Sequence, residues 1–117
     1  MVLCYNMSVG TVKTRQELVK ILQENRMTIF KISATWCGPC KRVDGFVRGC
    51  MAMLPDTVRI IFIDADEGSD ACNFLKIKKL PSFYFYVNKE RQYVLESANE
   101  REISNFFKRV HGVATCF

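Results

Sequence analysis

Three short apolar segments, separated by stretches of helical periodicity, constrain the fold of this chain more than any other feature. Residues 28–34, 58–63 and 83–87 are rich in β-branched and aromatic side chains, which is typical of strands buried inside a sheet. The stretches between them carry capping signals and apolar residues at helical spacing. Helices that cross from one strand to the next imply parallel strands, so the pattern predicts an α/β fold.

Signals at the ends of the elements refine this prediction. Thr14 and Glu17 form a capping-box pattern at the start of the first helix. Asn99 and Glu102 repeat that spacing before the last helix. A turn at residues 88–90 predicts an antiparallel hairpin, so we expect a central mixed β-sheet flanked by helices on both faces. The expected order is strand 9–13, helix 14–25, strand 28–34, helix 37–54, strand 58–63, helix 69–77, strand 83–87, strand 91–96 and helix 99–110, or β-α-β-α-β-α-β-β-α.

Two of these helices carry more detailed expectations. The helix that begins around Cys37 should end before Pro55 and bury one apolar stripe. The short helix at 69–77 should open on Ser69 or Asp70. The expected buried stripe of the longer helix comprises Val43, Phe46, Val47, Cys50 and Leu54.

The length of the chain bounds its organisation. With 117 residues and 13.5 kDa it is sized for one domain, which we expect over 1–117 with 1–7 as an N-terminal extension. A TIM barrel needs roughly 200 residues or more. A hydrophobic fraction of 49% also excludes a disordered chain governed by its charges.

The six cysteines divide into one close pair, Cys37 and Cys40, and four isolated residues. The N-terminal sequence lacks the basic region and apolar run of a secretory signal, and no segment approaches the roughly 18 apolar residues of a membrane span. We therefore expect a cytoplasmic protein without membrane attachment, in which isolated cysteines stay reduced. The isolated cysteines, expected to be buried small hydrophobes or inert surface thiols, are Cys4, Cys50, Cys72 and Cys116.

The close pair carries the chemistry. Cys37 lies where a strand gives way to a helix, and unpaired amides and the positive end of the helix dipole stabilise a thiolate there. A thiolate is the attacking species in thiol–disulfide exchange, and a second thiol one helical turn later can resolve the mixed disulfide. Pro39 suits the first helical turn, because its missing N–H would have no partner there.

Other uses of the pair fit the sequence less well. A structural zinc site needs four ligands, whereas the pair supplies two and the single histidine, His111, lies near the C-terminus. A purely structural disulfide across so short a loop would stabilise little. Iron–sulfur ligation would need further clustered cysteines. We therefore favour a redox role for Cys37 and Cys40, and we expect no bound metal.

The segment Ser33–Lys41, with the sequence SATWCGPCK, resembles the active-site segment of the thioredoxin family, and the expected element order matches the thioredoxin fold. The resemblance covers about residues 8–110. It implies a protein-disulfide oxidoreductase in which Cys37 is the nucleophile and Cys40 the buried resolving thiol. It also implies that the two form a redox-active disulfide.

The resemblance extends to the residues around the dithiol. It implies a cis peptide bond between Leu80 and Pro81, at a position that faces the dithiol and hydrogen-bonds an extended substrate. It implies a flat docking surface at Trp36, whose indole Asp66 would hold in place. An ordinary turn proline and a merely half-buried tryptophan are the alternatives. The substrate groove implied by the family comprises Trp36, Gly38, Pro39, Leu80, Pro81, Ser97 and Ala98.

The sequence departs from the family at Lys31, which stands where the family usually has a buried aspartate. A buried lysine could act as a base, or stay charged and favour thiolates, and we therefore include Lys31 among the candidate catalytic residues. It could equally reach solvent and play no part. We expect thiols that titrate lower, and a more oxidising disulfide, than in relatives with aspartate. Two smaller departures are Gly45, in place of a kinking proline, and Ser97, in place of a glycine that lines the groove.

The net charge of +5 is concentrated in part near the dithiol. It can be an ordinary solvated surface, or it can steer acidic partner proteins toward the site. The sequence has no basic stripe interleaved with aromatic residues, so we do not expect it to bind nucleic acid. The residues concerned are Lys41, Arg42, Lys76, Lys78 and Lys79.

Two functions are compatible with the sequence. The first is a monomeric thioredoxin-type reductase of protein disulfides, acting in electron transport and cell redox homeostasis. By resemblance it would bind no cofactor and would take electrons from a thioredoxin reductase with NADPH, or from a small thiol. The second is a docking subunit on the same scaffold, with little turnover, whose redox state acts as a switch.

Overall fold

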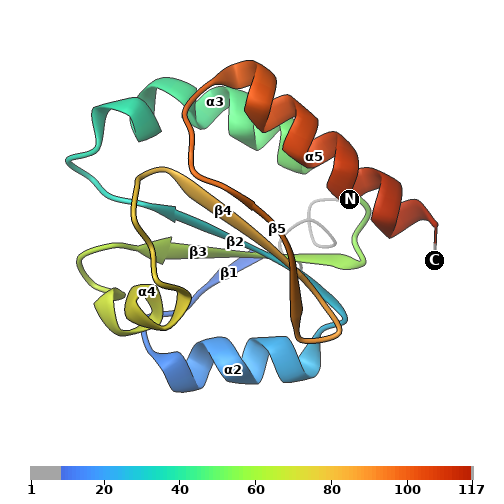
Figure 1. Ribbon diagram of the computed structural model, residues 1–117, viewed down its shortest axis with the longest axis horizontal. Helices are drawn as coiled ribbons and strands as arrows, with labels where there is room; N and C mark the ends of the chain where they lie inside the picture. Colours follow the sequence, from blue (N-terminus) through green and yellow to red (C-terminus); the bar gives the residue numbers. More distant parts are fainter. Residues whose placement is uncertain (1–8, 117) are drawn as a thin grey trace.

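The structure is a computed structural model that describes residues 9–116 (Figure 1). The expected N-terminal extension and Cys4 lie outside the described residues. The elements are β1 (Val9–Thr11), α2 (Arg15–Glu24), β2 (Met27–Ser33), α3 (Gly38–Ala52), β3 (Val58–Asp64), α4 (Ser69–Leu75), β4 (Ser82–Val87), β5 (Glu90–Leu95) and α5 (Glu100–Thr115).

The five strands form one mixed sheet in the order β1-β3-β2-β4-β5. Strands β1 and β2 both run parallel to β3, as crossover helices require. Strand β4 is antiparallel to β2 and is joined to β5 as a hairpin. The structure thus confirms the expected mixed sheet and places β2, the strand that leads to the dithiol, at its centre.

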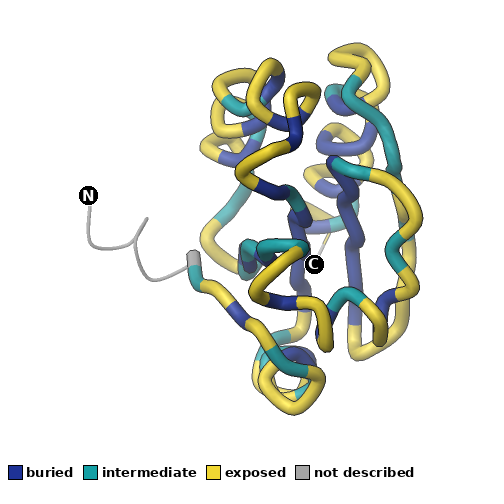
Figure 2. Tube along the Cα trace, turned by 90° about the vertical axis from the view of Figure 1, so that its left-hand side faces the viewer, coloured by how far each residue is buried: buried dark blue, intermediate teal, exposed yellow. Residues whose placement is uncertain are grey.

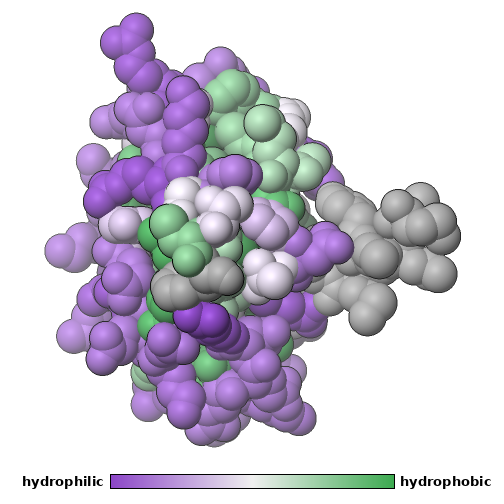
Figure 3. Space-filling view, turned by 90° about the vertical axis from the view of Figure 1, so that its right-hand side faces the viewer, coloured by the Kyte–Doolittle hydropathy of each residue, from purple (hydrophilic) through white to green (hydrophobic). Residues whose placement is uncertain are grey.

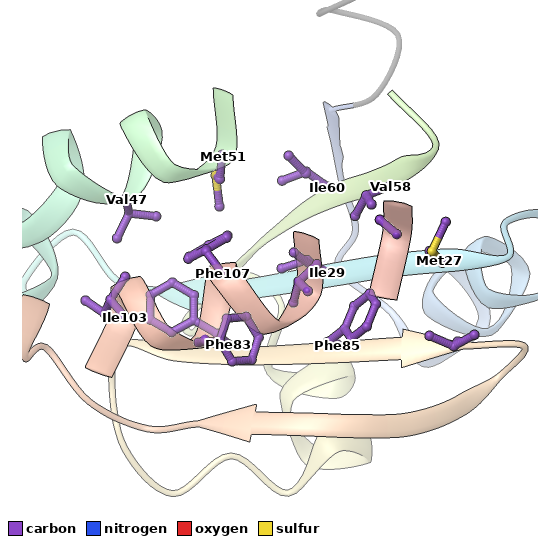
Figure 4. Close-up of a cluster of buried hydrophobic side chains, with 14 of the residues drawn as sticks. Met27, Ile29, Val47, Met51, Val58, Ile60, Phe83, Phe85, Ile103 and Phe107 are labelled. Atoms are coloured by element: carbon purple, nitrogen blue, oxygen red, sulfur yellow. The ribbon is translucent and has the colours of Figure 1, made fainter. Parts of the chain in front are cut away.

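The helices cover both faces of the sheet: α3 and α5 lie on one side, and α2 and α4 on the other (Figure 1). Each side has its own apolar core, and alternation along β4 supplies both. Phe83 and Phe85 face α3 and α5, where they lie among Val47, Met51 and other side chains (Figure 4). Burying each such side chain contributes about 1.5–3 kcal/mol.

The predicted caps and turn are present. The Thr14 hydroxyl accepts the Glu17 amide N–H at 3.1 Å, and the Glu17 carboxylate accepts the Thr14 amide N–H in return. The Asn99 side chain accepts from the first turn of α5. Asn88 and Lys89, with φ of 52° and 70°, form the two-residue hairpin turn.

The expected details of two helices need correction. In α3, Phe46 is 36% exposed and Cys50 is half-buried, whereas Met51 is buried. The helix ends at Ala52, so Leu54 lies beyond it. Helix α4 ends at Leu75, because Lys76 adopts a left-handed conformation with φ of 62°. The helix begins at Ser69, as expected, and its N-cap is Gly68, which makes no side-chain hydrogen bond.

The dithiol lies at the end of the molecule where the β2–α3 loop meets the segment before β4, on the left in Figure 1 and toward the viewer in Figure 2. Buried strands run behind the exposed loops of this end (Figure 2). The opposite side is mostly hydrophilic, with apolar side chains in smaller areas (Figure 3). Within residues 9–116, no helix has the length and hydropathy needed to cross a membrane.

Candidate active site

The central strand β2 delivers the chain to the dithiol. Cys37 is the N-cap of α3 and forms a disulfide with Cys40, with the two Cα atoms 5.3 Å apart. The Cys37 sulfur accepts the backbone N–H of Cys40 at 3.2 Å, as an N-cap side chain does in an ordinary helix. This hydrogen bond and the helix dipole favour negative charge on Cys37 once the disulfide is reduced.

The two cysteines differ in access. Both are buried, with exposed fractions of 5% and 3%. Cys37 lines a surface groove of about 630 Å³, whereas Cys40 is absent from the lining of that groove. The groove therefore presents one sulfur of the pair to a substrate.

The groove has two walls. One wall is the segment 36–39, which contains Trp36, Gly38 and Pro39. The other wall is the segment 77–80, which ends at Leu80, and Ala65, Asp66 and Cys72 complete the lining.

Trp36 is the most prominent feature of the first wall. Its side chain is 66% exposed, which is unusual for the single tryptophan of a small protein. The indole Nε1 donates to the Asp66 carboxylate at 2.9 Å. The hydrogen bond holds a large apolar surface in the open beside Cys37.

The second wall is also held in place. The peptide bond between Leu80 and Pro81 is cis, and Pro81 is buried. The hydroxyl of the buried Ser82 donates to the Lys79 carbonyl. Leu80 packs against the cluster formed by Ala34 and the two disulfide cysteines.

Three predicted groove residues lie outside the lining of this groove: Pro81, Ser97 and Ala98. The Ser97 hydroxyl donates to the Glu102 carboxylate and accepts the Asn99 amide N–H, so it supports the start of α5. Ala98 packs against the core beneath α3 and α5.

Lys31 is buried, with an exposed fraction of 6%, on the face of β2 that packs against α3. Its Nζ lies 3.2 Å from the Asp44 carboxylate and 5.6 Å from the centre of the Phe62 ring. The other Asp44 oxygen accepts from Arg48 Nε at 2.8 Å. The hydrogen bond from Arg48, and then that from Lys31, lower the pKa of Asp44 below its usual value. Lys31 thus pairs with a carboxylate one helical turn beyond Cys40, and it does not reach open solvent.

Sequence reasoning missed two residues near the dithiol. Asp44 could have been suspected from its position four residues after Cys40, which places both on one side of a helix. Cys72 lines the groove although it is distant in sequence, and no local pattern indicates this. Burial, followed by the nearby Asp64 charge, raises the pKa of the Cys72 thiol. Across residues 9–116, no group of three or more His, Cys, Asp or Glu side chains could hold a metal ion.

A disulfide-forming pair at a helix N-terminus, presented through a groove beside a cis-proline, defines a dithiol–disulfide oxidoreductase. Comparisons with known proteins agree with this class. The thioredoxin family model matches residues 9–109. Thioredoxin of Gallus gallus is 31% identical over 101 residues, covering 86% of this chain and 94% of that relative. The chain belongs to the thioredoxin family.

Two further relatives support this assignment. Thioredoxin of Ophiophagus hannah is 33% identical over 85 residues, covering 73% of this chain and 80% of that relative. The structure of Plasmodium falciparum thioredoxin superposes with a TM-score of 0.77 at 28% identity, covering 86% of this chain and 97% of that one. The family match over residues 9–109 includes the Cys37–Cys40 pair.

Proposed function

We propose that this chain reduces disulfides in other proteins, with Cys37 as the attacking thiol and Cys40 as the resolving thiol. The observation that carries the proposal is the N-cap position of the Cys37 sulfur at the groove. That position favours the thiolate at the sulfur that a substrate can reach.

The exchange has two steps. The Cys37 thiolate attacks one sulfur of the substrate disulfide, and the other substrate sulfur leaves as a thiolate and takes up a proton. Cys40 then loses its proton and attacks the Cys37 sulfur of the mixed disulfide. The second substrate thiol is released, and the Cys37–Cys40 disulfide forms, so the substrate has gained two electrons and the protein has lost two.

A catalytic cycle needs a donor that returns the two electrons. We propose a thioredoxin reductase with NADPH, or a small thiol, with no cofactor bound to the chain itself. This scheme would place the protein in electron transport to protein disulfides and in cell redox homeostasis.

We also propose a cytoplasmic location, where a reducing environment keeps isolated cysteines as thiols. The cysteines outside the active pair are free in the part of the chain that the structure describes, namely Cys50, Cys72 and Cys116. An oxidising compartment would expose these thiols to unwanted pairing.

Lys31 is the proposed tuning residue. The Lys31 cation offsets the Asp44 carboxylate on α3, and compared with an anion at the same position it favours thiolate forms of the dithiol. Titration of Cys37 in the native protein and in Lys31→Asp tests this effect. We expect a lower thiol pKa in the native protein, and identical titration curves would contradict the proposal.

Insulin disulfide reduction tests the main proposal, first with dithiothreitol and then with a thioredoxin reductase and NADPH. We expect turnover with both donors. Turnover with dithiothreitol alone would show that this reductase is not the donor. Absence of turnover with either donor would contradict the proposed function.

A further inference from the structure

The groove beside Cys37 has an uneven charge. Three charged side chains line it: Lys78, Lys79 and Asp66. The Asp66 carboxylate is occupied by the Trp36 indole at 2.9 Å. Within residues 9–116, the Lys78 and Lys79 ammonium groups have no ion-pair or hydrogen-bond partner, and both residues are exposed. The indole is neutral and leaves the Asp66 charge in place, so the groove carries two positive charges against one negative charge, and both ammonium groups are available to a ligand.

The surroundings of the groove extend this imbalance. The wall formed by the segment 77–80 is called the lysine wall below, because it carries Lys78 and Lys79. Lys76 is exposed just before this wall, and Lys41 and Arg42 are exposed in the first turns of α3. The acidic residues that follow Asp66 have partners within the protein. Glu67 pairs with Lys13 at 3.4 Å, and Asp70 accepts the Arg15 amide N–H at 2.6 Å.

The lysine wall is held in a defined position. At its start, the Ile77 amide N–H donates to the Cys72 carbonyl at 3.2 Å. At its end, the Lys79 carbonyl accepts from the hydroxyl of the buried Ser82. A fixed backbone presents the two side chains to a ligand at little cost in loop entropy.

The geometry points to a selective role: Lys78 and Lys79 recognise acidic side chains that flank the disulfide of a protein substrate. This inference rests on the proposed function and adds the substrate class to it. The occupant is an extended segment that places its cystine at Cys37 and one or more Asp or Glu side chains along the lysine wall. The uncharged side chains of this substrate segment contact the apolar surfaces of Trp36 and Leu80.

Charge recognition of this kind acts mainly on the rate of association. We expect kcat/KM to be about 3–10-fold higher for an acidic substrate than for a neutral one at low salt, and lower again for a basic one. At about 0.5 M salt, where the screening length falls to a few ångström, the three values should converge.

The test uses three synthetic peptides that each contain one disulfide and differ only in flanking residues: two Glu, two Gln or two Lys. Reduction by the dithiothreitol-maintained protein is compared between the native chain and Lys78→Glu/Lys79→Glu. The matched control is Lys20→Glu/Lys108→Glu, which makes the same charge change on exposed residues. Lys108, in α5, lies beside Met53 at the far end of α3, and Met53 is about 24 Å along α3 from Cys37.

We expect the groove variant to reverse the preference, so that the basic peptide is reduced fastest, while the control variant keeps the native order. Equal rates for the three peptides in the native protein at low salt would overturn the inference. An equal loss of preference in both variants would also overturn it, because the overall charge and not the groove would then select the substrate. If the neutral peptide is not reduced at all, the proposed function itself fails.

Discussion

Replacing Asp44 with alanine should destabilise the protein more than the loss of an ordinary surface ion pair. The change leaves the Lys31 ammonium in a site that is 6% exposed, facing the Phe62 ring and without its carboxylate. A buried cation without a partner is costly, because the protein interior does not replace its hydration. The affected contact joins β2, which leads to the dithiol, to α3, which begins at it.

The magnitude follows from the burial of the two partners. Exposed pairs contribute about 0.2–1 kcal/mol, and breaking a fully buried pair costs about 3–5 kcal/mol. Here the Lys31 side chain is 8% exposed and the Asp44 side chain is 38% exposed, so solvent screens the pair on one side. We expect a coupling of about 1–2 kcal/mol.

The assay is a double-mutant cycle by urea unfolding, with Lys31→Met, Asp44→Ala and the double variant. The double variant should lose less free energy of unfolding than the sum of the two single changes. Lys20 and Glu24, an exposed pair 4.0 Å apart in α2, provide the control cycle. A coupling between Lys31 and Asp44 no larger than that of the control pair would refute the reasoning.

The same pair predicts a pH dependence. The hydrogen bond from Arg48, and then that from Lys31, lower the pKa of Asp44 below its usual value of 3.8. The folded state therefore favours the ionised carboxylate. The pair should therefore contribute fully above the unfolded pKa, and its contribution should be lost as the pH falls through the lower folded pKa. The difference in free energy of unfolding between the native protein and Asp44→Ala should be constant above about pH 5 and shrink below 3.8. If this difference in free energy of unfolding grows toward low pH, the ionised Asp44 carboxylate does not stabilise the fold, and the reasoning is wrong.

Four further outcomes are expected. Gly68→Ala should cost about 1–3 kcal/mol in thermal or urea unfolding, because its Cβ would lie 2.8 Å from a backbone carbonyl oxygen. Gly45→Ala, in open space on α3, should instead stabilise by up to about 1 kcal/mol. Asp66→Ala should free the Trp36 indole and lower its fluorescence anisotropy with little loss of stability; unchanged anisotropy would argue against the hydrogen bond. Burial raises the pKa of Cys50, so iodoacetamide at neutral pH should alkylate it later than the N-cap thiol, as mass spectrometry can show.

Most of the fold could be predicted from local signals. The capping box at Thr14 and the hairpin turn at residues 88–90 depend on a few adjacent residues, and both are present in the structure. The placement of Cys37 at a helix N-terminus is also a local property of the strand–helix junction. These features need no knowledge of what packs against them.

The features that sequence reasoning missed depend on tertiary packing. Phe46 has the right spacing for the buried stripe, but the orientation of α3 against the sheet favours Met51. Gly68 caps α4 because the chain passes too close to Asp64 for a side chain, which is a contact between neighbouring segments. The pairing of Lys31 with Asp44 required the packing of β2 against α3.

Trapping of the mixed disulfide tests the central claim most directly. Insulin with its disulfides intact is mixed with the reduced Cys37→Ser and Cys40→Ser variants. The covalent adducts are located by mass spectrometry. Cys40→Ser should hold one insulin chain on Cys37, because only this sulfur of the pair lines the groove and the resolving thiol Cys40 is absent. Cys37→Ser should form little adduct. Equal trapping on Cys40, or no adduct with either variant, would contradict the assignment of Cys37 as the attacking thiol.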